Sequence, residues 1–298
     1  MKPTLLILAA GMGSRYGGQK QTDEFGPSGE TITDYSIYDG LRAGFGKVVF
    51  VIAPGMEEEF NAQYIKRFPR ELKVEYVIQD VKNVPEGFVV PDDRVKPWGT
   101  AHAVLMAKDV IREPFAVINA DDFYGRESYH IMHDFLTNCK PGEYVVIGYT
   151  LSKTVSEHGS VARGVCATDT DGFLTAINER TSIFSQQGKI FYEEEGKKHD
   201  LAPDTKVSMN LFGFTPDVFD HMERQFREYI SKNIHSAKAE FFIPYVADHL
   251  ITTGEATFKV LGTPESWFGV TYQDDRPHVL SMINQLVSEG VYPTPLWK

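Results

Sequence analysis

Arg15 and Lys20 follow the first apolar run of the chain, LLILAA (5–10), within a stretch that contains four glycines. Gly11 and Gly13 would let backbone N–H groups approach a polyphosphate without interference from a Cβ atom. A guanidinium fork and a flexible ammonium group would add positive charge for phosphate oxygens. The residue types and their spacing therefore predict a phosphate-binding turn.

Neither of the two common nucleotide motifs is complete in this stretch. The dinucleotide fingerprint G-x-G-x-x-G has Tyr16 where its third glycine must stand, and the P-loop has Gln19 where its lysine must stand. The stretch is therefore either a different phosphate-binding turn or a flexible connection whose charges face solvent. Other segments of the sequence are needed to distinguish these two interpretations.

Two further polar residues stand at the ends of apolar runs. Gln79 ends KVEYVIQ (73–79), and its amide can both donate and accept, which matches the O4 and N3–H edge of uracil or thymine. Asp121 follows PFAVINA (114–120), and a carboxylate near phosphate oxygens is a ligand for a hard cation such as Mg²⁺. These residues predict a nucleotide site that includes a metal ion.

Taken in order, these segments resemble the sugar-1-phosphate nucleotidyltransferases. LAAGMGSRYGGQKQ (8–21) is similar to the family loop L-A-A-G-x-G-[ST]-R followed by a lysine, and the resemblance continues to about residue 275. It implies that Arg15 and Lys20 act at the α-phosphate and that Asp121 binds Mg²⁺, with Asp122 as a supporting acid. It also implies that the backbone of the loop binds the nucleotide, through Ala10, Gly11 and Gly13.

The resemblance also covers the base and sugar segments. It implies that Gln79 reads the base of UTP or dTTP, a choice that stays open, and that the turn KPWGTAHAV (96–104) contacts the base through Gly99 and Thr100. Thr100 is also expected to cap the following helix. For the sugar phosphate the resemblance implies four residues: Gly164, Glu179, Arg180 in place of the usual lysine, and Asn210.

One departure concerns the second metal ligand. The family places it in a W-x-D sequence, but SWFGVTYQDDR (266–276) has Gly269 at the acidic position. Asp274 is our candidate for the second ligand, with Asp275 as its alternative. Two other interpretations stay open: both acids simply begin the last helix, or the metal is held by Asp121, phosphate and water.

The pattern of apolar runs indicates how these residues are positioned. Continuous runs rich in Val, Ile and Leu are typical of strands covered on both faces. They alternate with helix-like segments and predict an α/β fold with a three-layer, doubly wound, mostly parallel sheet, Rossmann-like as the resemblance also implies. Ligands in such folds bind at the carboxyl ends of the strands. The strands are expected at 4–10, 47–53, 73–79, 114–120 and 143–150, and the helices at 33–44, 57–68, 101–111 and 128–138.

After residue 150 the elements become shorter and more mixed. Strands are expected at 164–169, 174–180, 207–215 and 256–261, and helices at 216–233, 239–253 and 275–289. We therefore expect a catalytic domain over 1–225 and a smaller C-terminal α+β extension, mainly helical, over 226–298. Residues 80–99 have little periodicity and predict a long loop, of a length that is usually functional.

Composition excludes several other classes. The formal net charge is −11, which argues against a general nucleic-acid or anionic-membrane surface. No apolar stretch approaches the ~20 residues of a membrane span. Two cysteines, Cys139 and Cys166, make no disulfide framework, so we expect a cytoplasmic protein with reduced thiols. Whether it forms a homo-oligomer stays open.

The sequence as a whole favours an enzyme that converts an NTP and a sugar 1-phosphate into an NDP-sugar and pyrophosphate. A cytidylyltransferase acting on an alcohol phosphate is the nearest alternative, because Lys20-Gln21 is similar to that group. A non-catalytic sugar-nucleotide sensor is a third interpretation, supported by Gly269.

Overall fold

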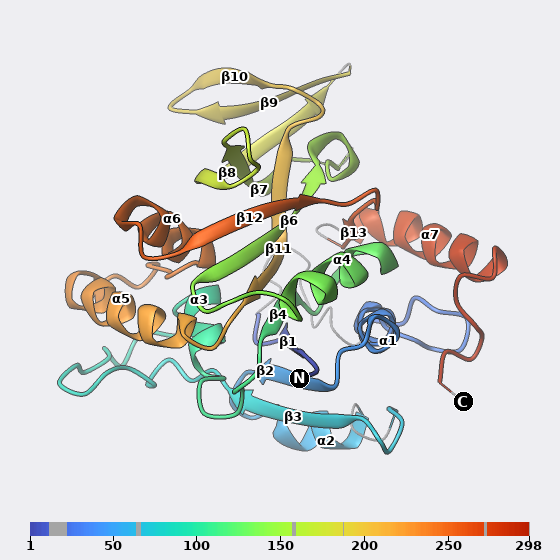
Figure 1. The fold of residues 1–298 in the computed structure, drawn as a ribbon, viewed down its shortest axis with the longest axis horizontal. Helices are drawn as coiled ribbons and strands as arrows, with labels where there is room; N and C mark the ends of the chain where they lie inside the picture. The colour runs from blue at the N-terminus through green and yellow to red at the C-terminus, as the bar shows by residue number, and fades with distance from the viewer. Residues whose placement is uncertain (12–22, 64–66, 157–158, 187, 271–272, 298) are drawn as a thin grey trace.

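A large central sheet organises the computed structural model, which describes residues 1–11, 23–63, 67–156, 159–186, 188–270 and 273–297 (Figure 1). Its first part is the parallel order β3-β2-β1-β4, and β11 continues it in antiparallel fashion. These strands are β1 (Thr4–Leu8), β2 (Lys47–Ile52), β3 (Lys73–Ile78), β4 (Phe115–Asn119) and β11 (Lys206–Phe214). The parallel strands predicted for the first 120 residues are confirmed.

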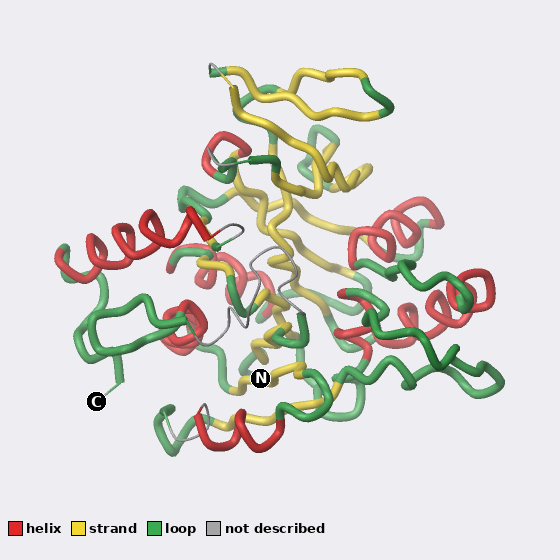
Figure 2. Tube along the Cα trace, turned by 180° about the vertical axis from the view of Figure 1, so that it is seen from behind, coloured by secondary structure: helices red, strands yellow, loops and turns green. Residues whose placement is uncertain are grey.

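Helices cover both faces of this sheet, as a three-layer fold requires (Figure 2). Alternate residues of β1 enter different cores: Leu6 packs in the core beneath one set of helices, and Leu5 and Ile7 pack beneath the other. The first set consists of α3 (Thr100–Leu105), α5 (Val218–Asn233) and α6 (Ile243–Thr253). The second consists of α1 (Ile32–Ala43), α2 (Glu57–Gln63) and α4 (Arg126–Leu136). The doubly wound arrangement is therefore present.

The later strands extend the sheet in antiparallel fashion. From β11 the order runs through β7, β8 and β9 to β10, and this arm stands at the top of Figure 1. Its strands are β7 (Val161–Thr168), β8 (Leu174–Gln186), β9 (Lys189–Glu194) and β10 (Lys197–Leu201). The sheet is thus mixed beyond β4, and the sequence did not predict β9 or β10.

The expected domain boundary lies between residues 225 and 226. It falls inside α5, and the chain after it returns to the sheet when β12 (Thr257–Gly262) pairs in parallel with β6 (Glu143–Thr150). A short 3-10 turn, η2 (Leu151–Lys153), follows β6. Since β12 also packs beside α6, most of the C-terminal region belongs to the same core.

The last helix, α7 (Arg276–Ser288), follows the 3-10 turn η3 (Gln273–Asp275) and packs on a separate apolar cluster with α1. Beside it lies a two-stranded ladder of β5 (Asp122–Phe123) and β13 (Phe268–Gly269). No helix in the described ranges is both long enough and apolar enough to span a bilayer.

Candidate active site

The ends of two neighbouring strands bring the first candidate residues to one edge of the sheet. Leu8 of β1 pairs with Asn119 of β4 in parallel register, so Ala10 and Asp121 each lie two residues beyond a matched pair. Ala10 is buried, whereas Gly11 is exposed and no described atom lies within 4 Å of a Cβ placed on it. The rest of the glycine loop lies outside the described residues, including Gly13, Arg15 and Lys20.

Two adjacent acids at this edge have different surroundings. Asp121 is half-buried, whereas Asp122 is buried, with Oδ2 2.9 Å from Asn119 Nδ2 and 3.3 Å from the Tyr124 hydroxyl. Burial raises the pKa of Tyr124 well above its usual value, so the hydroxyl stays neutral beside the carboxylate. Hydrogen bonds hold Asp122 in place, while Asp121 stands closer to solvent.

The donor set at this edge fits a magnesium ion that arrives with a nucleotide. In the part of the chain that the structure describes, no three His, Cys, Asp or Glu side chains form a group that could hold a metal by themselves. Mg²⁺ is usually held by one or two carboxylates together with substrate phosphates rather than by an all-protein cage. One or both of Asp121 and Asp122 could supply that contribution.

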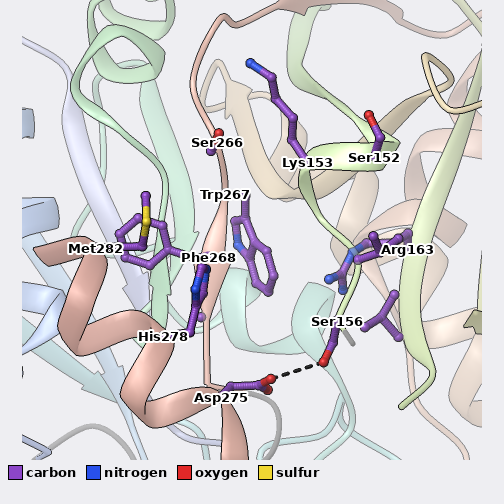
Figure 3. Close-up of a pocket in the computed structure, with 13 residues that line it drawn as sticks. Ser152, Lys153, Ser156, Arg163, Ser266, Trp267, Phe268, Asp275, His278 and Met282 are labelled. Carbon is purple, nitrogen blue, oxygen red and sulfur yellow. Dashed lines mark hydrogen bonds between the residues drawn. The ribbon is translucent and has the colours of Figure 1, made fainter. Parts of the chain in front are cut away.

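The candidate second ligand stands apart from these acids. Asp274 is exposed in η3 and lines neither of the two cavities described below. Asp275 is buried, and its Oδ1 lies 3.1 Å from Ser156 Oγ, which donates to it (Figure 3). Both acids therefore stand at the start of the last helix, which is one of the alternatives that the sequence left open.

On the base side, the structure brings Gln79 and Gly99 together. Gln79 is buried directly beyond β3, and its Nε2 lies 3.0 Å from the Gly99 carbonyl oxygen and 3.2 Å from His102 Nδ1. Gly99 has a φ of +101°, and a Cβ there would lie 2.6 Å from the Phe241 carbonyl oxygen. Only glycine fits this backbone, so the close approach is built into the turn.

Thr100 does not have the capping role that the sequence suggested. Helix α3 begins at Thr100 itself, after Gly99, and has no side-chain cap. The hydroxyl oxygen of Thr100 instead accepts a hydrogen bond of 3.1 Å from the backbone N–H of Ile243, the first residue of α6. Thr100 therefore ties α3 to α6, and α3 ends at Leu105 rather than at residue 111.

The sugar-side candidates, apart from Arg180, surround a small cavity of about 120 Å³. Asn119 and Asp122 also line it, so this cavity adjoins the strand end that carries the acids. Carboxylate and amide groups of this kind are typical hydrogen-bond partners for a polyhydroxylated ligand. Its lining includes Gly164, Glu179, Ser208, Asn210, Arg163 and Trp267.

The backbone around the cavity is specialised at two positions. Asn210 has a φ of +63° beside a register shift between Ser208 and Phe212 in β11, and asparagine tolerates this left-handed conformation better than most residues. A bulge of this kind turns a side chain away from the regular alternation of the strand. At Gly164, a Cβ would lie 3.1 Å from Ile177 Cδ1, so a side chain would crowd the cavity wall.

The structure does not bring Arg180 to this cavity. Adjacent residues of a strand point to opposite faces, so Glu179 faces the cavity and Arg180 faces away. Arg180 forms an ion pair with Glu194 of β9, and its guanidinium lies 4.4 Å from the centroid of the Tyr192 ring. The pair Glu179–Arg180 is therefore divided between two sides of the sheet.

The cation that does line the cavity is Arg163, which the sequence interpretation missed. It is 6% exposed, donates to the carbonyl oxygens of Thr154 and Ala162, and lies 4.5 Å from the Trp267 ring centroid. The sequence carries one signal for the role of Arg163: it is a charged residue directly before Gly164, in a strand that is otherwise largely apolar. Arg163 also lines a second, larger cavity, so it stands between the two.

This second cavity has a volume of about 420 Å³ and lies between η2, β7, β13 and the start of α7 (Figure 3). Its wall combines the apolar rings of Trp267 and Phe268 with the cations Lys153 and Arg163. Gly269 belongs to the lining as well, so the position at which the resemblance implies a carboxylate is part of this wall.

This chain is similar to known proteins both in its sequence family and in its fold. The model of the family described as Nucleotidyl transferase matches residues 4–274. A search of the curated proteins by sequence finds no match.

Two solved structures show the same fold across nearly the whole chain. An inositol-1-phosphate CTP transferase from T. maritima is 12% identical, with a TM-score of 0.64, over 95% of this chain and 97% of that one. A protein described as a glucose-1-phosphate thymidylyltransferase from Bacillus anthracis, in complex with a sucrose, is 16% identical, with a TM-score of 0.63, over 94% of each chain.

Proposed function

The chain belongs to the nucleotidyl transferase family, and on that premise we propose that it joins an NTP to a sugar 1-phosphate, releasing pyrophosphate and forming an NDP-sugar. The observation that carries this proposal is the cavity that joins Glu179 and Asn210 to the acid-bearing end of β4. Hydroxyl-binding groups lie there beside the edge at which phosphates would be held.

The proposed reaction requires positioning and charge neutralisation. A phosphate oxygen of the sugar 1-phosphate attacks the α-phosphorus, and pyrophosphate leaves from the opposite side. The attacking phosphate is already ionised at neutral pH, so no general base is needed. Arg15 and Lys20 are proposed to stabilise the charge on the α-phosphate.

Enzymes of this family generally use a divalent metal, and we propose Mg²⁺ here, held by Asp121. When bound, the ion would neutralise phosphate charge and orient the triphosphate. In the same proposal Asp122 orients Asn119, to which it is hydrogen-bonded, at the rim of the cavity. Asp274 remains our proposed candidate for the second metal ligand.

For the nucleotide we propose UTP or dTTP, on the basis of Gln79. A cytidylyltransferase acting on an alcohol phosphate is the second candidate, because the T. maritima structure is described as an inositol-1-phosphate CTP transferase. The hydroxyl-binding cavity is compatible with either acceptor, since inositol and hexoses both present vicinal hydroxyls.

One screen separates these candidates. The purified protein is incubated with Mg²⁺ and each of UTP, dTTP, CTP, ATP and GTP, against glucose 1-phosphate and inositol 1-phosphate, and pyrophosphate release is measured. Release with UTP or dTTP and glucose 1-phosphate supports the proposal. Release only with CTP and inositol 1-phosphate supports the second candidate. Nucleotide binding with no release under any pairing would favour a sensor.

A further inference from the structure

Three polar groups form a chain of hydrogen bonds that ends at Gln79. The carbonyl oxygen of Asn83 lies 2.8 Å from His102 Nε2, and His102 Nδ1 lies 3.2 Å from Gln79 Nε2. The same Gln79 nitrogen lies 3.0 Å from the carbonyl oxygen of Gly99.

The chemistry of these groups allows one arrangement of hydrogens. A carbonyl oxygen can only accept, so neutral His102 must carry its proton on Nε2 and donate to Asn83. Nδ1 is then an acceptor, and the amide nitrogen of Gln79 donates one hydrogen to it. The second amide hydrogen goes to the Gly99 carbonyl, which leaves Gln79 Oε1 as the group that can face a ligand.

We propose that His102, held by the carbonyl of Asn83, is a positioning residue that makes Gln79 a hydrogen-bond acceptor toward the nucleobase and thereby favours uracil or thymine over cytosine. The inference rests on the proposed function of Gln79. Uracil and thymine present an N3–H donor at this edge, whereas cytosine N3 is an acceptor and would oppose Oε1.

The surroundings of His102 keep this arrangement fixed. The side chain is fully buried, and its ring centroid lies 4.8 Å from that of Phe226 on α5. Burial lowers the pKa of His102 to about 4, so the ring stays neutral near pH 7. The charged form would place an N–H against the Gln79 amide hydrogens, and this does not occur at physiological pH.

The long loop 80–99 supplies the group that fixes the tautomer. The backbone N–H of Asn83 donates to the Asp80 carbonyl, and the Trp98 indole N–H donates to the Val81 carbonyl at 2.8 Å. Hydrogen bonds within the loop therefore hold the chain next to the Asn83 carbonyl. In this proposal, the loop that the sequence predicts over residues 80–99 has a specific role, because it carries the carbonyl that orients His102.

The test compares variants of His102 by their nucleotide selectivity. His102→Leu removes the acceptor, and His102→Phe does so while keeping a ring against Phe226, in case the smaller side chain impairs folding. His102→Asn places an amide oxygen near the position of Nδ1 and keeps an acceptor. Val104→Ala, a buried change two residues along α3, is the matched control. Thermal unfolding confirms that each variant is folded.

Selectivity is measured as the UTP:CTP ratio of kcat/KM for pyrophosphate release, and again as the ratio of equilibrium binding constants. Loss of one hydrogen bond to Gln79 is expected to lower the wild-type preference for UTP about five- to tenfold in His102→Leu and His102→Phe. His102→Asn should restore most of the ratio, and Val104→Ala should keep it.

Two results would overturn the inference: an unchanged ratio in both His102→Leu and His102→Phe, or a wild-type protein that prefers CTP. An equal loss in His102→Asn would overturn the acceptor argument as well. Failure of the proposed function looks different, because the wild-type protein would then release no pyrophosphate from any nucleotide. The binding ratios would still decide the role of His102.

Discussion

Asp122 and Gly269 face each other across the short ladder of β5 and β13, and a Cβ on Gly269 would lie 2.7 Å from Asp122 Oδ1. The carboxylate of Asp122 therefore occupies the space that a side chain at position 269 would need. A glycine at 269 and an acid at 122 form a sterically matched pair, which gives a physical reason for the departure from the W-x-D sequence.

This relationship predicts that Gly269→Ala destabilises the protein. The added methyl group must displace the Asp122 carboxylate, and such overpacking typically costs about 1–3 kcal/mol. Chemical denaturation measures the loss. Gly262→Ala serves as the control for stability, because the nearest atoms to a Cβ at Gly262 belong to the Lys206 side chain, at 3.7 Å and 3.8 Å. Equal stability of the two variants would contradict the steric pairing.

Asp121→Asn is expected to lower turnover by about a hundredfold or more, because a neutral amide is a weaker ligand for a divalent cation. The concentration of Mg²⁺ that gives half-maximal activity should rise at the same time, and a Mg²⁺ titration measures both quantities. Asp204→Asn, at an exposed turn residue, is the control. An unchanged Mg²⁺ requirement would remove Asp121 from the metal site.

Lys20→Ala is expected to lower kcat strongly while leaving the thermal unfolding temperature unchanged. The reason is that a charge on the α-phosphate matters most in the transition state. Pyrophosphate release under saturating NTP and sugar 1-phosphate measures the effect. Near-wild-type release would exclude the proposed role of Lys20.

Glu179→Gln is expected to raise the KM for the sugar 1-phosphate about tenfold, because hydrogen bonds to a charged group contribute about 1.5–3 kcal/mol. Arg180→Gln provides the informative comparison, since Arg180 faces away from the cavity and pairs with Glu194. Its effect on KM should be the smaller of the two. A larger effect at Arg180 would mean that the sugar phosphate binds on the other side of β8.

Asp39→Asn tests a buried acid on α1. Burial raises the pKa of Asp39 to about 7, with Glu265 contributing, whereas the hydrogen bond from Tyr292 and the charges of Arg126 and Arg42 lower it. The native state thus holds the proton more tightly than the unfolded state, in which the group titrates near pH 4. Stability from this group therefore falls as pH rises from about 4 to 7, by an amount on the order of 4 kcal/mol.

The asparagine variant has no charge to bury, so its unfolding temperature relative to the wild type should rise between pH 5 and pH 8. The Tyr292 hydroxyl, 2.7 Å from Oδ2 in the wild type, can still donate to the amide oxygen. Asp204→Asn should show the wild-type dependence on pH. A constant difference between Asp39→Asn and the wild type would contradict the raised pKa.

The first half of the fold could be predicted because its strands are continuous apolar runs. Leu5, Leu6 and Ile7 are buried in alternate cores, so consecutive positions in the middle of the strand must be apolar. The hairpin of β9 and β10 was missed because β10 is polar and mostly exposed, and the apolar run of β9, Ile190 to Tyr192, is short. Its turn, Glu195-Gly196, has positive φ at both residues, and Glu-Gly is a weaker signal for such turns than Asn-Gly.

The position of a candidate site residue could be predicted from the sequence where that residue lies at the end of a strand. The direction of a side chain within a strand was harder to predict, because it depends on the register of the strand. Gln79 follows β3 directly and Asp121 lies two residues beyond β4, and parallel strands bring their ends to one edge of the sheet. The separation of Glu179 from Arg180 follows from the alternation of β8. The left-handed backbone of Asn210 depends on a register shift that no local pattern in the sequence reveals.

The place of β11 has a consequence for synthesis on the ribosome. β4 is made long before β11, yet the antiparallel edge of β4 is covered only when β11 pairs with it. Until then a nascent chain would present an apolar strand edge, the kind of surface that drives aggregation. This strand order predicts that expression of the protein depends on chaperones, and that slower translation between β4 and β11 increases aggregation because it lengthens the exposure of this edge.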